Sequence, residues 1–507
     1  MEQLRLDRFP FWQRLHHAVK RDARPTAMYV PWVLPKWLTN RGMVYYFIAL
    51  LVVTLLFSVR SMPWYYMLSG AVSVLLFWAY GQHLSRRYSL RNVNSTVQFE
   101  RRIFSMAFFL RLIWMLLIYV IFMETYDNPF GFDNYDAMTY HVMGKFIADM
   151  LDHEQYNLYS ALSARFHFDI SDMGYGTYVG VIYYLTNNSI IAVRLLKCLW
   201  SALTVVLVYR LAMRHFGPQI ARITAIFCTL WPNFWYYCGV HLKEVEMVFL
   251  VVLFVEQADQ MMRSRQFTVW KLIPLLLIVG ALFTIRTVAA LVAILALLVS
   301  VVMASSRVVS WGKRIIVGLV AVVLIGVTMG ERIEREVTHM TQMVQSDSQQ
   351  HNMEWRSRRK NGNVFAKYAG TAVFAPMIFT IPFPSMVNVT GQDVQQLLNG
   401  GNYIKNILSF FVLASLFIMF FSGSWRDHML PLAFMLGYIM VLVMSGFPHS
   451  ERFHQPVMPF EFMFASYGLS IVMSNKKYQQ WFKVWCVVML VAAIAWNWFK
   501  LAGRGLA

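Results

Sequence analysis

The segment SIIAVRLLKCLWSALTVVLVYRLAM, residues 189–213, is long and apolar enough to cross a membrane as one helix. A hydrocarbon core of about 30 Å requires about 20 apolar residues, and a helix satisfies its own backbone hydrogen bonds there. Similar runs recur from Met43 to Trp498 in a chain of 507 residues that is 58% hydrophobic and only 14% charged. This composition excludes a soluble globular protein and predicts an all-α polytopic membrane protein.

Thirteen apolar runs predict about thirteen transmembrane helices. They cover residues 43–60, 64–82, 103–123, 189–213, 219–237, 244–262, 272–286, 288–304, 314–330, 407–423, 429–446, 459–474 and 484–500. The resulting parts of the chain are a basic N-terminal segment with two helices (1–102), a transmembrane core with an external loop at 124–188 (103–330), a second external loop (331–406) and the C-terminal helices (407–507).

The distribution of charge orients this bundle. The connections 83–102, 214–222, 263–271, 305–314 and 475–483 all carry an excess of Lys and Arg, which is typical of cytoplasmic loops. The loop 124–188 instead has nine acidic residues against Lys145 and Arg165, so it is expected outside, in the periplasm or a lumen. The net charge of +19 therefore reflects membrane topology, and no nucleic-acid partner is expected. We expect an integral protein of a bacterial inner membrane with its site facing the periplasm.

The external loop contains GFDNYDAMTYHVMGKFIADML, residues 131–151, in which Asp133 and Asp136 precede an amphipathic helix. A second segment, GYGTYVGVIYYL at 174–185, is also expected to form a juxtamembrane helix. One interpretation is that either aspartate caps the first helix by accepting hydrogen bonds from its free N–H groups. The other is that a carboxylate at the membrane surface accepts a proton from a substrate hydroxyl.

Several motifs occur in an order that resembles the GT-C superfamily, membrane glycosyltransferases that use polyprenyl-phosphate-linked sugars and include protein O-mannosyltransferases and the lipid A aminoarabinose transferase. The resemblance covers roughly residues 100–260 and 440–475, and 270–305 more loosely. It rests on Asp136-Ala-Met-Thr-Tyr140, Arg194 near a helix start, Phe216-Gly217 at a cytoplasmic turn, Trp231-Pro232, Lys243-Glu244, and Arg452, Phe453, Pro456 and Pro459 in SERFHQPVMPFEFMFASYG.

This resemblance implies an enzyme whose external-loop aspartate is the catalytic base, at Asp136 or, in the neighbouring register, Asp133. An acceptor hydroxyl of a lipid, glycan or protein would attack the anomeric carbon, displace polyprenyl phosphate and invert the centre. Basic residues would hold the leaving phosphate. The candidate substrate-binding residues are Tyr140, Lys243, Glu244, Arg286, Arg452, His454, Arg356, Arg358 and Arg359.

Structural alternatives exist for several of these residues. Arg286 lies between two apolar runs, where it either serves a function or snorkels to the interface. Glu244 either pairs with Lys243 or binds the acceptor, and the basic run 356–360 is either a clamp or a solvated loop. Snorkelling is the favoured interpretation of Arg111, near the cytoplasmic end of its run.

No cofactor is expected to be required, because the histidines do not show the spacing of a metal site. A divalent cation that bridges Asp136 and a phosphate is the alternative. Two other functions are weighed: a polysaccharide polymerase or ligase that uses a lipid-pyrophosphate oligosaccharide, and a transporter of lipid-linked glycans. A transporter should place polar residues through the middle of several spans, whereas here they gather on the external side.

Overall fold

A computed structural model describes residues 33–89, 95–132, 134–153, 170–264, 270, 272–305, 309, 312, 315, 379–380, 382–444 and 451–502. These residues form helices and no strand, and one isolated antiparallel bridge joins Ser61 and Val387. The prediction of an all-α fold is confirmed for this part of the chain.

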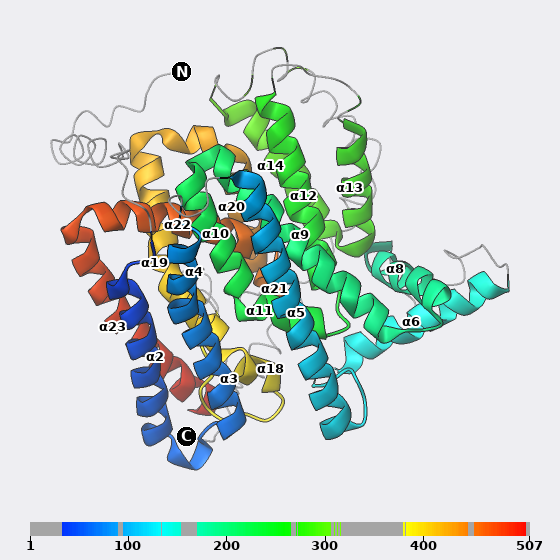
Figure 1. Cartoon of the computed structure of the whole chain (residues 1–507), viewed down its shortest axis with the longest axis horizontal. Helices are drawn as coiled ribbons and strands as arrows, with labels where there is room; N and C mark the ends of the chain where they lie inside the picture. Colours follow the sequence, from blue (N-terminus) through cyan, green and yellow to red (C-terminus); the bar gives the residue numbers. More distant parts are fainter. Residues whose placement is uncertain are drawn as a thin grey trace, which may run out of the picture.

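The helices have the following bounds (Figure 1). They are α2 (Lys36–Leu56), α3 (Trp64–Leu75), α4 (Gly81–Arg87), α5 (Thr96–Tyr126), α6 (Asn134–Asp152), α8 (Ile170–Thr186), α9 (Ile190–Phe216), α10 (Pro218–Leu230), α11 (Pro232–Gly239), α12 (Glu244–Arg263), α13 (Leu272–Ile285), α14 (Thr287–Met303), α18 (Asp393–Leu397), α19 (Asn399–Ser422), α20 (Met429–Met444), α21 (Glu451–His454), α22 (Met458–Ser474) and α23 (Lys476–Ala502), with the short turns η2 (Ser58–Arg60), η3 (Leu76–Tyr80) and η5 (Ser424–His428).

Six described helical segments are long and apolar enough to cross a membrane, so an integral membrane protein is indicated but thirteen spans are not confirmed. The six are α2, α5, α9, α19, η5 with α20 (Ser424–Val443), and α23. The helices α13 and α14 are apolar but shorter. The predicted run 64–82 is helical throughout and contains the π-helical turn η3, whereas 219–237 is divided into α10 and α11 at Trp231 and Pro232. The run 314–330 lies outside the described residues except Ile315.

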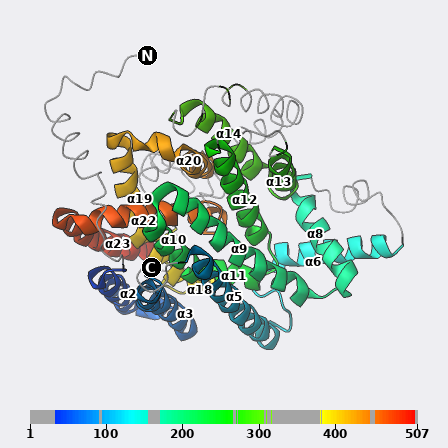
Figure 2. The same ribbon diagram turned by 45° about the horizontal axis from the view of Figure 1, so that its top comes forward.

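The centre of the molecule is formed by α9, α10, α12, α19 and α22, which pack against one another in turn. Figure 2 shows α10 and α22 in the middle of this group. The turn from α9 to α10 uses Gly217, whose φ of 85° suits glycine, and Pro218 then begins the next helix.

Arg111 lies inside this core and does not snorkel, which corrects the sequence interpretation. Its side chain is fully buried and donates hydrogen bonds to Ser201 Oγ at 2.6 Å and to the carbonyl oxygens of Ala107 and Cys228, both at 3.0 Å. These acceptors lie on α5, α9 and α10. The arginine therefore joins three helices, because a buried guanidinium must find hydrogen-bond acceptors within the protein.

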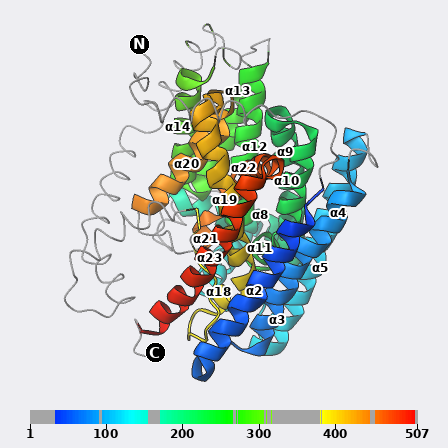
Figure 3. The ribbon, with the colours of Figure 1, turned by 90° about the vertical axis from the view of Figure 1, so that its left-hand side faces the viewer.

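The helices α2 and α3, for which no role was predicted, form an outer layer against α19 and α23 (Figures 1 and 3). They also hold the segment that leads into α19. Tyr46 and Tyr66 donate hydrogen bonds to Asn399 at 2.6 Å and to Asp393 at 2.9 Å, respectively. The end of the predicted loop 331–406 is thus packed on the N-terminal helices.

Both helices predicted in the loop 124–188 are present as α6 and α8. They pack closely against each other to one side of the bundle, where α6 runs across the direction of α5 (Figure 1). Glycine permits this contact: a Cβ at Gly180 would lie 2.5 Å from Ile147, and one at Gly144 would lie 2.5 Å from Val179. Because Asp136 lies near the start of α6, this packing fixes where its carboxylate sits.

Candidate active site

Arg452 joins three elements that are far apart in the sequence. Its Nη1 donates to Asp136 Oδ2 of α6 at 2.6 Å, and its Nε donates to Glu244 Oε1 at the start of α12. The Arg452 side chain is 17% exposed, Glu244 is 4% exposed and Asp136 is 43% exposed. Burial alone would lower the pKa of Arg452, but the two carboxylates, Glu244 first, raise it above its ordinary value. The guanidinium is therefore always charged.

Asp136 is the third residue of α6, so it lies within the first turn and not before it. No hydrogen bond from a backbone N–H to its carboxylate is present among the described residues. One carboxylate oxygen, Oδ2, accepts from Arg452, and the other, Oδ1, has no partner in the described part of the chain. Asp136 is thus partly exposed with one oxygen available, and a negative charge in the first turn suits the helix dipole.

The residues after the helix break at Gly239 place a second cation beside this cluster. Lys243 directly precedes α12, is buried, and has its Nζ 5.9 Å from the centre of the Tyr140 ring. Tyr140 lies one turn after Asp136 on α6. Glu244, the next residue, accepts the hydrogen bond from Arg452, a partner that the sequence did not predict for it.

Arg286 lies between α13 and α14 in extended backbone and is partly exposed. Its guanidinium carbon is 5.4 Å from the centre of the Phe453 ring, next to Arg452 in the chain. This arrangement combines cation–π attraction with a position at a helix junction. Arg286 is thus a third cation near the cluster, and it comes from the junction of α13 and α14.

His454, at the end of α21, faces the interior. Its Nδ1 is 2.6 Å from Lys405 Nζ of α19, and Lys405 is 3.7 Å from Glu461 of α22. An ammonium group only donates, so Nδ1 of His454 is the acceptor in this contact. The histidine therefore anchors α21 to the core, and the sequence predicted neither its partner Lys405 nor the pair of Lys405 with Glu461.

Two buried cations of α9 bind the connections that lead into α6 and α12, the helices of Asp136 and Glu244. Arg194 donates to the carbonyl oxygen of Pro129, just before α6. Lys197, one turn further on, donates to the carbonyl oxygen of Leu242 and to Glu246 Oε2 at 3.1 Å. Since breaking such a buried pair is costly, α9 restricts the positions of both Asp136 and Glu244.

A buried polar chain lies behind α6. Tyr183 Oη is 2.7 Å from His141 Nδ1 and 3.5 Å from His241 Nε2. Burial, and then the charge of Lys145, lowers the pKa of His141 to about 4, and burial lowers that of His241 well below its ordinary value. Both rings are therefore neutral near pH 7 and serve as hydrogen-bonding groups.

Four predicted site residues lie outside the described residues: Asp133, Arg356, Arg358 and Arg359. Within the described part of the chain, no three His, Cys, Asp or Glu side chains are grouped so that they could hold a metal ion. The expectation that no cofactor is required stays a prediction.

The fold and the site together define a class: a helical membrane protein with carboxylates and cations gathered where several helices begin. The Asp136 oxygen that Arg452 does not contact can accept a proton, and Lys243 and Arg286 can attract an anion. Such a combination suits a reaction in which a hydroxyl attacks and an anionic group leaves.

Residues 178–329 match the model of the dolichyl-phosphate-mannose-protein mannosyltransferase family. This match confirms the resemblance to the GT-C superfamily over that segment and indicates a membrane glycosyltransferase. The segment extends from within α8 to beyond α14 and includes Lys243, Glu244 and Arg286, whereas Asp136 and Arg452 lie outside it. No curated protein matches the chain.

Proposed function

We propose that the protein transfers a sugar from a polyprenyl-phosphate donor to a hydroxyl acceptor, at the external face of a bacterial inner membrane and with inversion of the anomeric centre. The observation that carries the proposal is the contact of Arg452 with both Asp136 and Glu244. It gathers residues from three separate helices at one end of α12. The family match over residues 178–329 supports the donor class.

In the proposed mechanism Asp136 is the catalytic base. Its Oδ2 is held by Arg452 at 2.6 Å, so the carboxylate is oriented, and Oδ1 takes the proton of the acceptor hydroxyl. The oxygen of that hydroxyl forms the new bond to the anomeric carbon as the bond from this carbon to the phosphate oxygen breaks. Polyprenyl phosphate leaves with the electron pair.

Lys243 and Arg286 are proposed to stabilise the phosphate. Both cations lie beside the Asp136–Arg452–Glu244 cluster, Lys243 directly before α12 and Arg286 between α13 and α14. Arg452 contributes less attraction for an anion, because two carboxylates already offset its charge. We therefore assign Arg452 the role of positioning Asp136. His454 acts through its contact with Lys405, as an anchor for α21.

The test is transfer from a polyprenyl-phosphate sugar in proteoliposomes by the wild-type protein and by Asp136→Asn. The matched control is Asp149→Asn on the same helix, whose carboxylate is exposed and pairs with His153. Removing a general base should lower the rate about 100- to 10,000-fold, and the control should retain wild-type activity. Full activity of Asp136→Asn would refute the assignment of the base.

The donor class has a separate test in the lipid that co-purifies with the protein. Mass spectrometry should detect a polyprenyl monophosphate or its sugar ester. A lipid-pyrophosphate oligosaccharide would instead favour the polymerase or ligase, and the proposal would then be wrong.

A further inference from the structure

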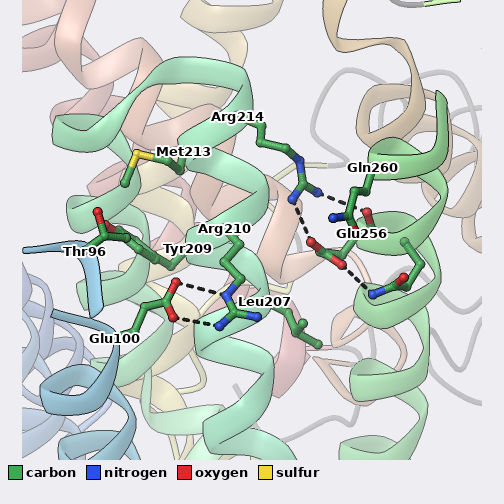
Figure 4. Close-up of a pocket in the computed structure, with 10 residues that line it drawn as sticks. Thr96, Glu100, Leu207, Tyr209, Arg210, Met213, Arg214, Glu256 and Gln260 are labelled. Carbon is green, nitrogen blue, oxygen red and sulfur yellow. Dashed lines mark hydrogen bonds and ion pairs between the residues drawn. The ribbon is translucent and has the colours of Figure 1, made fainter. Parts of the chain in front are cut away.

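A pocket of about 310 Å³ opens between α5, α9 and α12, away from the candidate active site (Figure 4). Twelve residues of α12 separate Glu244 in the site from Glu256 in the pocket, about 18 Å along the helix axis. The pocket lies near the start of α5 and the ends of α9 and α12, and Arg214 in its lining begins the basic connection 214–222. In a membrane-spanning bundle, helix ends of this kind meet the level of the lipid headgroups.

The pocket is lined by equal numbers of positively and negatively charged side chains, which form ion pairs. Arg210 donates to both oxygens of Glu100, at 3.0 and 2.7 Å, and Arg214 donates to Glu256 at 2.7 Å. Figure 4 shows these two ion pairs on neighbouring turns of α9. An isolated anion would meet two carboxylates and an isolated cation would meet two guanidinium groups. A ligand that carries one charge of each sign matches the pocket better.

Both donors and acceptors in the pocket lining can form further hydrogen bonds. Arg210 is 51% exposed and uses two of its five N–H donors on Glu100, and the others have no acceptor among the described residues. The side-chain amide of Gln260 likewise has no partner in the described part of the chain. Donors of Arg210 suit a phosphate, and oxygens of Glu100 and Gln260 suit a primary ammonium group.

The remaining lining and the size of the pocket fit the polar end of a lipid. Leu207 and Met213, both half-buried, supply apolar surface on α9 next to the two arginines. A volume of about 310 Å³ is at the small end of the range for ligand sites, about 300–1,000 Å³. A headgroup fits within it, and the acyl chains would extend along the helices.

We propose that this pocket binds the headgroup of a zwitterionic phospholipid with a primary ammonium group, of the phosphatidylethanolamine type. The phosphate binds the outward N–H groups of Arg210, and the ammonium group donates to Glu100 and Gln260. Phosphatidylcholine is excluded from this arrangement because its trimethylammonium group cannot donate hydrogen bonds. The inference requires a membrane but does not depend on the proposed transferase function.

The test is native mass spectrometry of the full-length protein in detergent, titrated with synthetic phosphatidylethanolamine, phosphatidylcholine and phosphatidylglycerol that have the same acyl chains. Phosphatidylethanolamine should bind most tightly. The double variant Glu100→Gln/Arg210→Gln should weaken its binding at least about tenfold, since it removes two charge-assisted contacts. This ion pair is partly exposed, so its loss should cost little stability.

Two further variants make the result specific. Arg101→Gln removes a charge from an exposed residue next to Glu100 that does not line the pocket, so its binding should stay within about twofold of wild type. Gln260→Leu removes the amide without breaking an ion pair and should also weaken binding of phosphatidylethanolamine. Equal binding of the three lipids, tighter binding of phosphatidylglycerol, or full binding by both pocket variants would overturn the proposal.

Discussion

Replacing Arg452 tests the central contact of the candidate site. Arg452→Gln leaves Glu244, which is 4% exposed, without its cation. Removing one partner of a buried ion pair typically costs about 3–5 kcal/mol, so we expect a loss of that size. Asp136 is 43% exposed and can be solvated, so Asp136→Asn should cost no more than about 1 kcal/mol.

The double variant Arg452→Gln/Glu244→Gln distinguishes the interaction energy of the ion pair from the separate effects of changing each side chain. With both charges removed, no uncompensated carboxylate remains, and its cost should be less than the sum of the single variants by at least about 2 kcal/mol. The free energy of unfolding can be measured by SDS titration in mixed micelles, with tryptophan fluorescence as the signal. Costs that add to within about 0.5 kcal/mol would show that the two side chains do not interact in the folded protein.

Two further predictions concern the support of the site. His141 has a pKa of about 4 in the folded protein, below its ordinary value of about 6.5, so the unfolded chain binds more protons between these values. The free energy of unfolding should reach its full value above about pH 6.5 and should fall as the pH is lowered towards 4. In His141→Gln the free energy of unfolding should depend less on pH. An unchanged slope in this variant would exclude the buried neutral ring as the cause of the dependence. Gly180→Ala should destabilise the protein by about 1–3 kcal/mol because its Cβ would lie 2.5 Å from Ile147. The control is Gly280→Ala, where a Cβ meets nothing within 4 Å, and equal melting temperatures for the two variants would contradict the close packing of α6 on α8.

The amino-acid sequence was sufficient for the fold class because hydrophobicity is a local property. Apolar runs indicated helices, and the helices α6 and α8 were expected from periodicity and aromatic content. Helix interruptions were harder to predict, since a run such as 219–237 has the same composition whether or not Pro232 starts a new helix. The number of spans therefore could not be obtained from hydropathy alone.

Individual site residues could be named from sequence, but their partners could not. Asp136, Glu244 and Arg452 were all candidates, yet their contact joins residues more than 100 positions apart, and no local pattern encodes such pairing. The same holds for Arg111, which the local sequence placed at an interface and the packing of α5, α9 and α10 buries.

The sequence by itself determined that this chain is helical, membrane-embedded and asymmetric in charge. Only the tertiary structure decided that one oxygen of Asp136 is held by Arg452 while the other remains without a partner among the described residues. It also decided that Glu244 pairs with Arg452 and that α2 and α3 support the segment before α19. The physical reason is that hydrophobic burial depends on composition along the chain, whereas ion pairs and hydrogen bonds depend on distances of about 3 Å between side chains.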